Sequence, residues 1–194
     1  MTAIITDLAS VKAWGGHGTT TNDTRLTELV NSVDFAFQTW MKRPAEQVSR
    51  VELIPVIHEF DRMVVLQASP IVSITTVIIS ATRDFTGAPE SASDYTSDAE
   101  AGTLHFDFDL TAGINTMQVT YVGGMAADVA AFKLAYPDIH HWANVQVEYE
   151  WERRNNAGAT SVTEANSNRS FTAGVQILKG AIEAMAPYRR VTIR

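Results

Sequence analysis

The fold of the second half of this chain is decided by residues 137–155, which read PDIHHWANVQVEYEWERRN. Apolar and polar residues alternate from Ala143 to Glu152, and this period of two residues is typical of a β-strand with one solvent-exposed face. Other features favour a helix. Pro137 suits the first helical turn, where its missing N–H is not needed, and Asp138 suits the positive end of the helix dipole. Because the stretch is also long for a strand, we predict a helix over residues 137–154.

The surface of this predicted helix is mostly apolar. With side chains spaced at 100° per residue, the apolar ones cover well over half of the circumference. The remaining polar stripe consists of His141, Asn144, Glu148 and Glu152. A helix of this kind needs cover on two sides. In a chain of this size the second cover can be a neighbouring subunit, so we predict that Val147 and Trp151 contribute to a subunit interface.

An arm is predicted after this helix. Residues 155–174 are rich in Asn, Ala, Gly, Thr and Ser and cannot bury enough apolar surface to fold alone. A short amphipathic segment follows and is closed by Pro187. Its apolar residues at helical spacing are Ile177, Leu178, Ala181, Ile182 and Met185. We therefore divide the chain into a globular body at residues 1–155 and an arm at residues 156–194.

The tip of the arm is basic, although the chain is acidic. The formal net charge is −7, yet the last six residues hold three Arg and no acid. Such a tail favours binding to a partner over completion of its own core. Val191-Thr192-Ile193 could add a strand to a sheet edge of that partner, and contact of the Arg cluster with DNA is the alternative. The predicted anchors are Leu178, Ile182 and Met185 as an apolar stripe, Tyr188 as a ring with a polar tip, and Arg189 and Arg190 as carboxylate-binding forks.

Two helices are predicted at the N-terminus. Thr6 or Asp7 can cap a short helix over residues 6–14, because a side-chain oxygen accepts from the free N–H groups of the first turn. Gly15-Gly16 ends it. Asn22 or Asp23 can cap a longer helix over residues 23–42, in which apolar residues recur at three- and four-residue steps, and Pro44 stops that helix.

Strands are predicted within residues 48–122. Pro55 lies in the first of them and cannot donate to a ladder, which suggests an edge strand. Ala68-Ser69-Pro70 suggests a bent connection or a hairpin between two predicted strands, one beginning at Met63 and the other at Ile71. From Leu104 to Leu110, and again from Met117 to Tyr121, apolar and polar residues alternate as in half-buried strands. The chain is therefore expected to be α+β, with long helices flanking a small, mostly antiparallel sheet.

Composition excludes several classes of protein. The chain of 194 residues has no Cys, so it has neither a disulfide framework nor a thiolate zinc site. Its acidity argues against a broad nucleic-acid-binding face. Residues 71–81 form the longest apolar run and are too short to span a membrane. The N-terminus lacks the features of a signal peptide, so assembly in the cytosol is expected.

Catalytic and metal sites are not expected. His140 and His141 with Glu148 lack a third ligand at a recognisable spacing. His105, Asp107 and Asp109 share one strand face and could act as acid and base, but an exposed sheet face gives the same pattern without chemistry. We predict neither an enzyme nor a cofactor. A small hydrolase with the His105 face in a pocket, or a monomeric interaction module, remains an alternative.

The order of the motifs resembles the head-tail connector, or adaptor, proteins of tailed phages. A short and a long helix come first, and the predicted helix over residues 137–154 comes late. The motifs between and after them are LQASPIVSI at residues 66–74, DY at 94–95, EAGTL at 100–104, VTYVGG at 119–124 and APYRR at 186–190. The resemblance covers nearly the whole chain.

This resemblance implies a structural virion protein of the neck. It implies a homo-oligomeric ring of twelve copies beneath the portal protein, with a stopper or tail-completion protein attached on the tail side. The arm would reach the portal in such an assembly. DNA would pass through the channel without specific binding, which an acidic wall favours because it repels phosphates.

Overall fold

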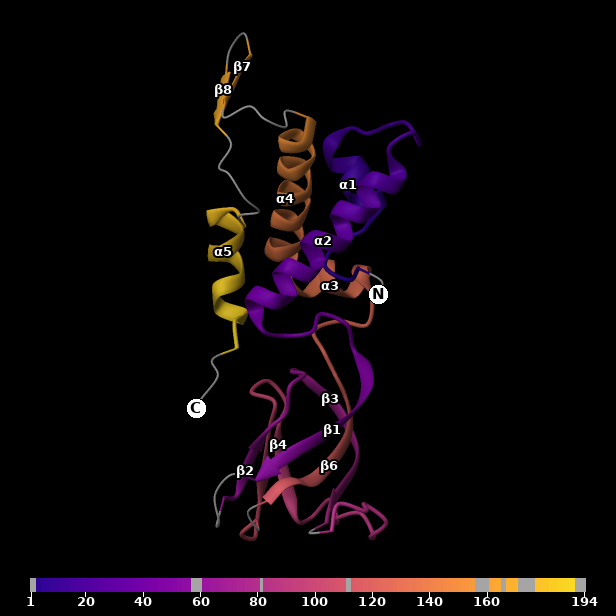
Figure 1. The fold of residues 1–194 in the computed structure, drawn as a ribbon, viewed down its shortest axis with the longest axis vertical. Helices are drawn as coiled ribbons and strands as arrows, with labels where there is room; N and C mark the ends of the chain where they lie inside the picture. Colours follow the sequence, from indigo (N-terminus) through magenta and orange to yellow (C-terminus); the bar gives the residue numbers. More distant parts are fainter. Residues whose placement is uncertain are drawn as a thin grey trace. The chain divides into compact units, whose positions relative to one another are not determined.

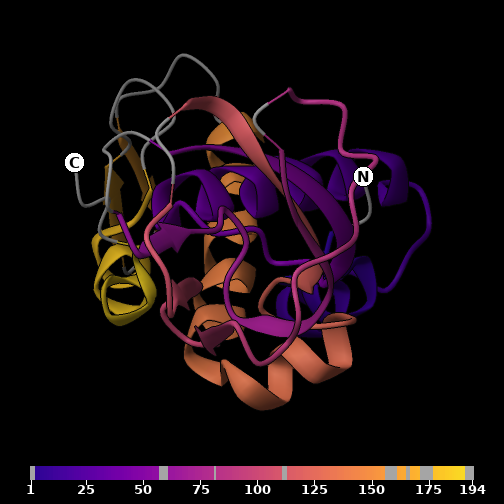
Figure 2. The same ribbon diagram turned by 90° about the horizontal axis from the view of Figure 1, so that it is seen from below.

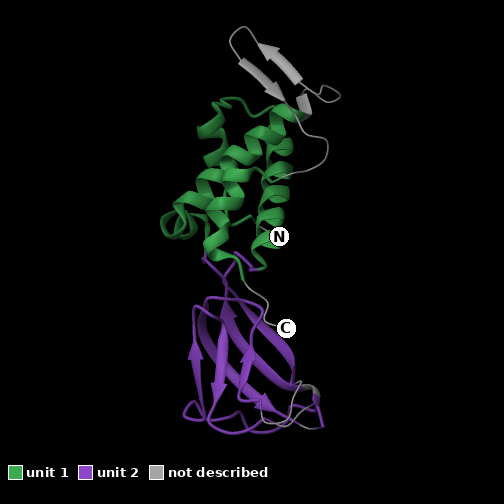
Figure 3. Ribbon diagram, turned by 90° about the vertical axis from the view of Figure 1, so that its left-hand side faces the viewer, with its two compact units in different colours: residues 1–42, 128–194 green, residues 43–127 purple. Residues whose placement is uncertain are grey.

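The computed structural model describes residues 3–56, 61–80, 82–110, 113–155, 161–164, 167–170 and 177–190. The chain forms two compact units (Figure 3). Residues 1–42 and 128–194 form a helical unit, and residues 43–127 form a β unit. A separation of body and arm at residue 155 stays a prediction. No helix in the described ranges combines the length and apolar character needed to cross a membrane.

In the part of the helical unit that the structure describes there are five α-helices, whose arrangement is drawn in Figure 1. They are α1 (Leu8–Gly15), α2 (Asp23–Met41), α3 (Val129–Ala135), α4 (Pro137–Asn155) and α5 (Lys179–Met185), and α5 continues into the 3₁₀ turn η1 (Ala186–Tyr188). Between α4 and α5, strands β7 (Ser161–Glu164) and β8 (Ser167–Ser170) pair antiparallel. The helices predicted over residues 6–14, 23–42 and 137–154 are thereby confirmed.

Local signals set the ends of the N-terminal helices. The Asp7 carboxylate accepts from the Ser10 N–H at 2.7 Å and caps α1, and Gly16 ends α1 in the left-handed region with φ of 69°. Asn22 occupies the N-cap position of α2 without a side-chain capping bond. Lys42, with φ of 55°, ends α2 two residues before Pro44.

Helix α4 is the central element of the helical unit. It packs against α1, α2, α3 and α5, and Figure 2 shows it with α5 on one side and α1 on the other. Ile139, Ala143 and Val147 on α4 have no exposed surface. Apolar residues lie around most of the circumference of α4 rather than on one face, and helices of the same chain cover this surface.

The β unit is made of two three-stranded antiparallel sheets. The first has the order β1 (Val48–Val56), β6 (Gly113–Gly123), β3 (Ile71–Ile79), and the second has the order β2 (Met63–Val65), β5 (Thr103–Phe106), β4 (Tyr95–Asp98). The predicted strands are confirmed as antiparallel, and they divide between two sheets. Both sheets contribute to one core, which includes Val64, Leu104, Met117 and Val119.

Two sequence signals have clear outcomes in this unit. Pro55 lies in edge strand β1, where the register with β6 shifts between Ile54 and Val56, so the edge prediction is confirmed. The Ala68–Pro70 stretch is the bent connection of the two options, since it joins β2 of one sheet to β3 of the other. The alternation from Leu104 to Leu110 predicts a strand that is too long, because β5 ends at Phe106. Beyond it, the Asp107 N–H donates to the Asp94 carbonyl at 3.1 Å.

A polar cluster holds the Ala68–Pro70 connection to the first sheet. The buried Tyr121 hydroxyl accepts from the Ala68 N–H at 2.9 Å and donates to a Glu52 carboxylate oxygen at 2.8 Å. That oxygen also accepts from the Gln67 N–H at 2.9 Å. Burial is the main reason that the pKa of Tyr121 is raised to about 12, and Glu52 raises it further while the Ala68 N–H lowers it.

We expect Tyr121→Phe to remove an alkaline loss of stability. In the wild type the folded state holds the Tyr121 proton above its ordinary pKa of 10, so the free energy of unfolding should fall as pH rises from there toward 12. The variant should be less stable by about 1–2 kcal/mol at neutral pH, because Ala68 and Glu52 lose a partner, and its alkaline decline should be shallower. Urea unfolding across this pH range measures both effects. An alkaline decline unchanged in Tyr121→Phe would contradict the assignment, and Tyr95→Phe serves as the control.

Candidate docking segment at the C-terminus

The C-terminal segment (residues 177–190) starts on a buried side chain of α4. The Gln146 amide oxygen accepts from the Leu178 N–H at 2.8 Å, directly before α5 begins. The Gln146 amide nitrogen donates to Glu150, and the same carboxylate forms an ion pair with Arg153 at 2.9 Å. Because Gln146 and Glu150 are both buried, these partners satisfy polar groups that would otherwise destabilise the unit.

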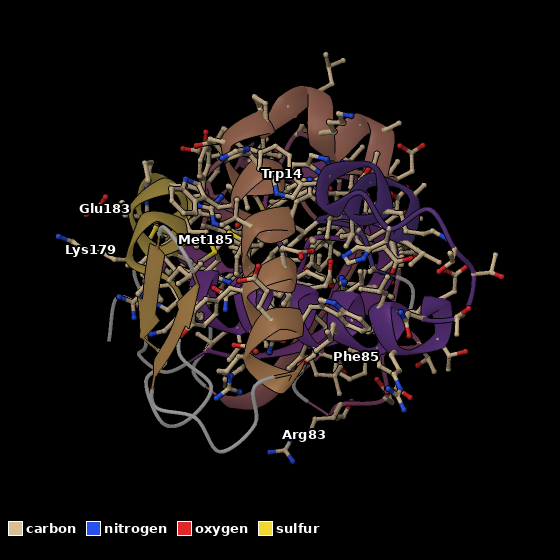
Figure 4. The ribbon with its side chains drawn as sticks, turned by 90° about the horizontal axis from the view of Figure 1, so that it is seen from above. Trp14, Arg83, Phe85, Lys179, Glu183 and Met185 are labelled. Atoms are coloured by element: carbon tan, nitrogen blue, oxygen red, sulfur yellow. The ribbon has the colours of Figure 1, made fainter. Side chains whose placement is uncertain are left out.

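One face of α5 packs against α4. Ala181 and Met185 have no exposed surface. Gly180 lies so close to α4 that a Cβ atom there would overlap the Trp142 indole. On the opposite face, Lys179 and Glu183 point away from the unit (Figure 4) and form an exposed ion pair at 3.6 Å, which contributes little to stability.

The end of the segment contacts α2 and Tyr136, the residue between α3 and α4. The Tyr188 ring meets the Tyr136 ring edge-on, with centroids 5.1 Å apart. The Arg189 guanidinium lies 4.9 Å from the centroid of the Trp40 ring, which is within the range of a cation–π interaction. The Arg190 N–H donates to the Met41 carbonyl at 2.9 Å. This carbonyl belongs to the last turn of α2 and has no partner within the helix.

The six predicted anchors of the arm are thus placed within their own chain. Met185 is buried, and Arg189 is exposed apart from its contact with Trp40. The half-buried anchors are Leu178, Ile182, Tyr188 and Arg190. The strand addition predicted for Val191-Thr192-Ile193 lies outside the described residues. Binding of a partner by the six anchors stays a prediction, and Met185 could take part only if α5 left α4.

The two residues predicted at a subunit interface are also covered by their own chain. Val147 is completely buried, and Trp151 is 9% exposed, with its ring meeting the His17 ring at 5.6 Å. Contact of these residues with a second subunit stays a prediction. An Asp at Val147 would disrupt the helical core before it could report on assembly.

The two histidines of α4 have different surroundings and separate partners. The buried His140 ring pairs through Nδ1 with the Ile5 carbonyl at 2.8 Å, whereas the exposed His141 ring packs on Trp14. Glu148 pairs with His17 at 2.9 Å. Among the described residues no group of three potential ligands converges.

The predicted polar stripe of α4 needs one correction. Asn144 is buried rather than solvated, because the Thr6 hydroxyl donates to its carbonyl oxygen and its amide nitrogen lies 3.4 Å from His140 Nε2. A short polar side chain can enter a helical core when local partners satisfy it.

The residues of the His105 face, which could act as acid and base, are placed on the surface of the β unit. His105 is exposed on β5, and its Nε2 lies 3.2 Å from the Thr103 hydroxyl. Asp109 forms an ion pair with Arg62, and its hydrogen bond raises the pKa of that guanidinium. Asp107 is an exposed residue beyond the end of β5. His105 and Asp109 thus have surface partners within the β unit.

The net charge of the chain resides in one unit. The β unit, residues 43–127, has four Lys or Arg against eleven Asp or Glu, which gives −7. The helical unit has eleven of each and is neutral. The basic C-terminus is therefore balanced within its own unit, and the acidity belongs to the sheets and their loops.

Comparisons with known proteins give a consistent result. The neck of an empty gene transfer agent particle, computed with C6 symmetry, contains a chain that matches with a TM-score of 0.61 at 12% identity, covering 97% of this chain and 93% of that one. A chain in the neck of the native particle, computed with C12 symmetry, matches with a TM-score of 0.57 at 10% identity, covering 96% and 92%. These likenesses show a shared fold.

Sequence comparison adds the family. No curated protein matches the chain. The model of a family described as "Head completion protein" matches residues 4–190, which is nearly the whole chain and spans both units. The chain therefore belongs to the head completion protein family and is a structural protein of the phage head–tail connection.

Proposed function

We propose that this protein forms a ring in the virion neck, beneath the portal protein, and joins the DNA-filled head to the tail. The observation that carries this proposal is the family match over residues 4–190. The likeness to chains in the necks of gene transfer agent particles supports the same location. Twelve copies are proposed because the neck of the native particle was computed with C12 symmetry. The C6 symmetry used for the neck of the empty particle is compatible with a ring of twelve copies, since six-fold symmetry is contained in twelve-fold symmetry.

The distribution of charge supports passage of DNA through such a ring. A β unit with a net charge of −7 repels phosphates and offers few sites at which a duplex could bind. The protein would assemble in the host cytoplasm and act by binding rather than by catalysis. Its proposed partners are the portal protein above and a stopper or tail-completion protein below.

The C-terminal segment is the proposed attachment to the portal. Arg189 is exposed, and Tyr188, Ile182 and Leu178 are half-buried in the helical unit. Whether the segment is docked or released, the N–H donors at the edge of the Arg189 guanidinium can pair with a carboxylate of the partner, because stacking on Trp40 uses only the face of the guanidinium. Arg190 adds a second positive charge at the same place.

The proposal is tested by reversing the charge of the two arginines. We expect Arg189→Glu/Arg190→Glu to reduce retention on purified portal rings at least roughly tenfold, because charge-assisted contacts to carboxylates become repulsive. Cosedimentation of the full-length chain with portal rings measures retention. Deleting the whole arm would be less informative, since it would also expose the faces that Ala181 and Met185 cover.

The matched control changes the net charge by the same amount elsewhere in the helical unit. Arg25 on α2 and Lys133 on α3 are both exposed, and Arg25→Glu/Lys133→Glu should bind as the wild type does. Thermal unfolding of both variants checks that the unit stays folded. Equal retention by the two double variants would show that the arginines are not the attachment.

A further inference from the structure

The β unit carries exposed apolar side chains on the outer faces of its two sheets. Among the described residues of this unit, the large apolar side chains that are exposed are Val51 and Leu53 on β1, Met63 and Val65 on β2, and Val72 at the bulge of β3, with exposed fractions of 38–63%. Their alternate neighbours Ile54 and Val64 enter the shared core. The exposed residues therefore point away from it.

None of the described residues on the outer face of the first sheet is charged. Val51 lies opposite Thr120, Leu53 opposite Gln118 and Ser49 opposite Val122 in the pairing of β1 with β6. On the other side of β6, Thr76 and Ile78 of β3 continue the same rows. We call this surface, made of Ser49, Val51, Leu53, Thr76, Ile78, Gln118, Thr120 and Val122, the first face.

The outer face of the second sheet is smaller. Met63 lies opposite His105, and Val65 lies opposite Thr103. Across β5, Thr96 pairs with His105 and Asp98 pairs with Thr103. We call this surface, made of Met63, Val65, Thr96, Asp98, Thr103 and His105, the second face. Its apolar part is the β2 side.

The charge of the unit restricts what these faces can meet. A second β unit also carries −7, so two copies repel each other wherever acidic loops meet. They can approach through the first face, which has no charge, and the apolar side of the second face. A basic partner would be attracted to the acidic loops rather than to an uncharged surface. The first face therefore suits another copy of this chain.

The presence of two different faces indicates how copies would pair. If the first face met another first face, the contact would be isologous and would stop at a pair, leaving Met63 and Val65 exposed. A contact between the first face of one copy and the second face of the next repeats from copy to copy, and it gives a ring when the rotation between neighbours closes, as the proposed ring requires. This arrangement covers both apolar patches in every copy.

We propose that neighbouring subunits contact each other through their β units, with the first face of one copy packed on the β2 side of the second face of the next. This inference rests on the proposed ring. It assigns Val51 and Leu53 on one subunit, and Met63 and Val65 on the other, to the interface. Exposure of these side chains in the single chain means that they can be replaced with little effect on folding.

Cysteine crosslinking tests the pairing, because the chain has no Cys of its own. Val51→Cys and Met63→Cys are made singly and together and assembled on portal-bearing capsids, followed by a short thiol-specific crosslinker. We expect the double variant to give a ladder of products up to the full ring and each single variant to give only monomer. The double variant Thr82→Cys/Ser91→Cys, in exposed loops of the same unit, is the control and should give no ladder.

The outcomes separate this inference from the proposed function. A covalent dimer from either single variant, or no ladder in capsids that visibly carry the ring, would overturn the face-to-face pairing and leave the ring intact. Absence of the protein from the necks of wild-type particles would overturn both.

As a second measure, Leu53→Glu should raise the protein concentration needed for ring assembly roughly tenfold or more, because it places a charge in an apolar contact. Ser91→Glu, in an exposed loop of the same unit, should leave that concentration unchanged.

Discussion

Asp34→Ala is expected to lower the free energy of unfolding of the helical unit by roughly 3–5 kcal/mol. Asp34 lies on α2 and is only 3% exposed. Its Oδ1 atom accepts from the N–H groups of Ile4 and Ile5 at 2.9 and 2.8 Å, and its Oδ2 accepts from Gln38. An Ala would leave two buried amides without an acceptor, which costs more than the bonds themselves contribute.

The loss would extend beyond the two amides. The Ile5 side chain is completely buried, and the Ile5 carbonyl is the partner of His140 on α4. Release of residues 4–5 would therefore open the contact between the N-terminal segment and α4. Urea unfolding of the full-length chain, followed by circular dichroism, gives the change in free energy.

Two comparisons make the Asp34 test specific. Asp34→Asn keeps an oxygen that can accept from both amides and should recover part of the stability. Glu28→Ala removes an exposed acid from the same helix and should change the free energy by less than about 0.5 kcal/mol. A value for Asp34→Ala as small as that for Glu28→Ala would show that the amides find other partners.

Helix α4 shows what could be predicted from the sequence and why. Pro137 and Asp138 predicted the helix correctly, although the alternation from Ala143 onward has the period of a strand. The alternation arises because α4 is covered by four other helices. Apolar residues are then needed around most of its circumference, and buried Asn144, Gln146 and Glu150 are tolerated because each has a partner.

Those partners could not be predicted from the sequence. An acid within the apolar stripe of α2 marks Asp34 as unusual, but nothing in the pattern indicates that backbone amides about thirty residues away bind it. Likewise, the Gln146 side chain accepts a hydrogen bond from the Leu178 N–H, although β7 and β8 lie between these two residues in the sequence. Contacts of this kind depend on tertiary placement, which local periodicity does not contain.

The C-terminal segment shows the same limit. The spacing of Ala181, Ile182 and Met185 predicted an apolar face correctly, and α5 covers residues 179–185. The sequence suggested that this face meets a partner, whereas Ala181 and Met185 meet their own chain in this structure. An amphipathic pattern indicates that a helix face is buried, but it does not indicate whether the same chain or a partner buries it.

Gly180→Val is expected to detach α5 from α4. A Cβ atom at Gly180 would overlap the Trp142 indole, so the helix must shift or the ring must leave its place. Overpacking of this kind costs about 1–3 kcal/mol, which corresponds to amide exchange in α5 that is faster by roughly 5- to 150-fold. Hydrogen exchange of residues 179–185 followed by mass spectrometry measures the change.

Matched variants separate overlap from helix propensity. Glu183→Val introduces the same β-branched residue on the exposed face of α5 and should change exchange far less. Trp142→Ala opens space beside Gly180, so the double variant with Gly180→Val should exchange more slowly than additivity of the two single changes requires. Equal exchange in Gly180→Val and Glu183→Val would show that the close approach to Trp142 is not what holds α5.

The same variant decides which form of the segment the portal binds. Met185 cannot contact a partner while it is buried against its own chain, so the intrachain contact competes with any binding that uses the full apolar stripe. Weakening that contact increases the population of the released segment and should increase apparent affinity for portal rings in proportion. We therefore expect Gly180→Val to bind portal rings more tightly than the wild type does. Weaker binding would show instead that the portal recognises α5 in its docked position, with Arg189 on Trp40 as the exposed contact.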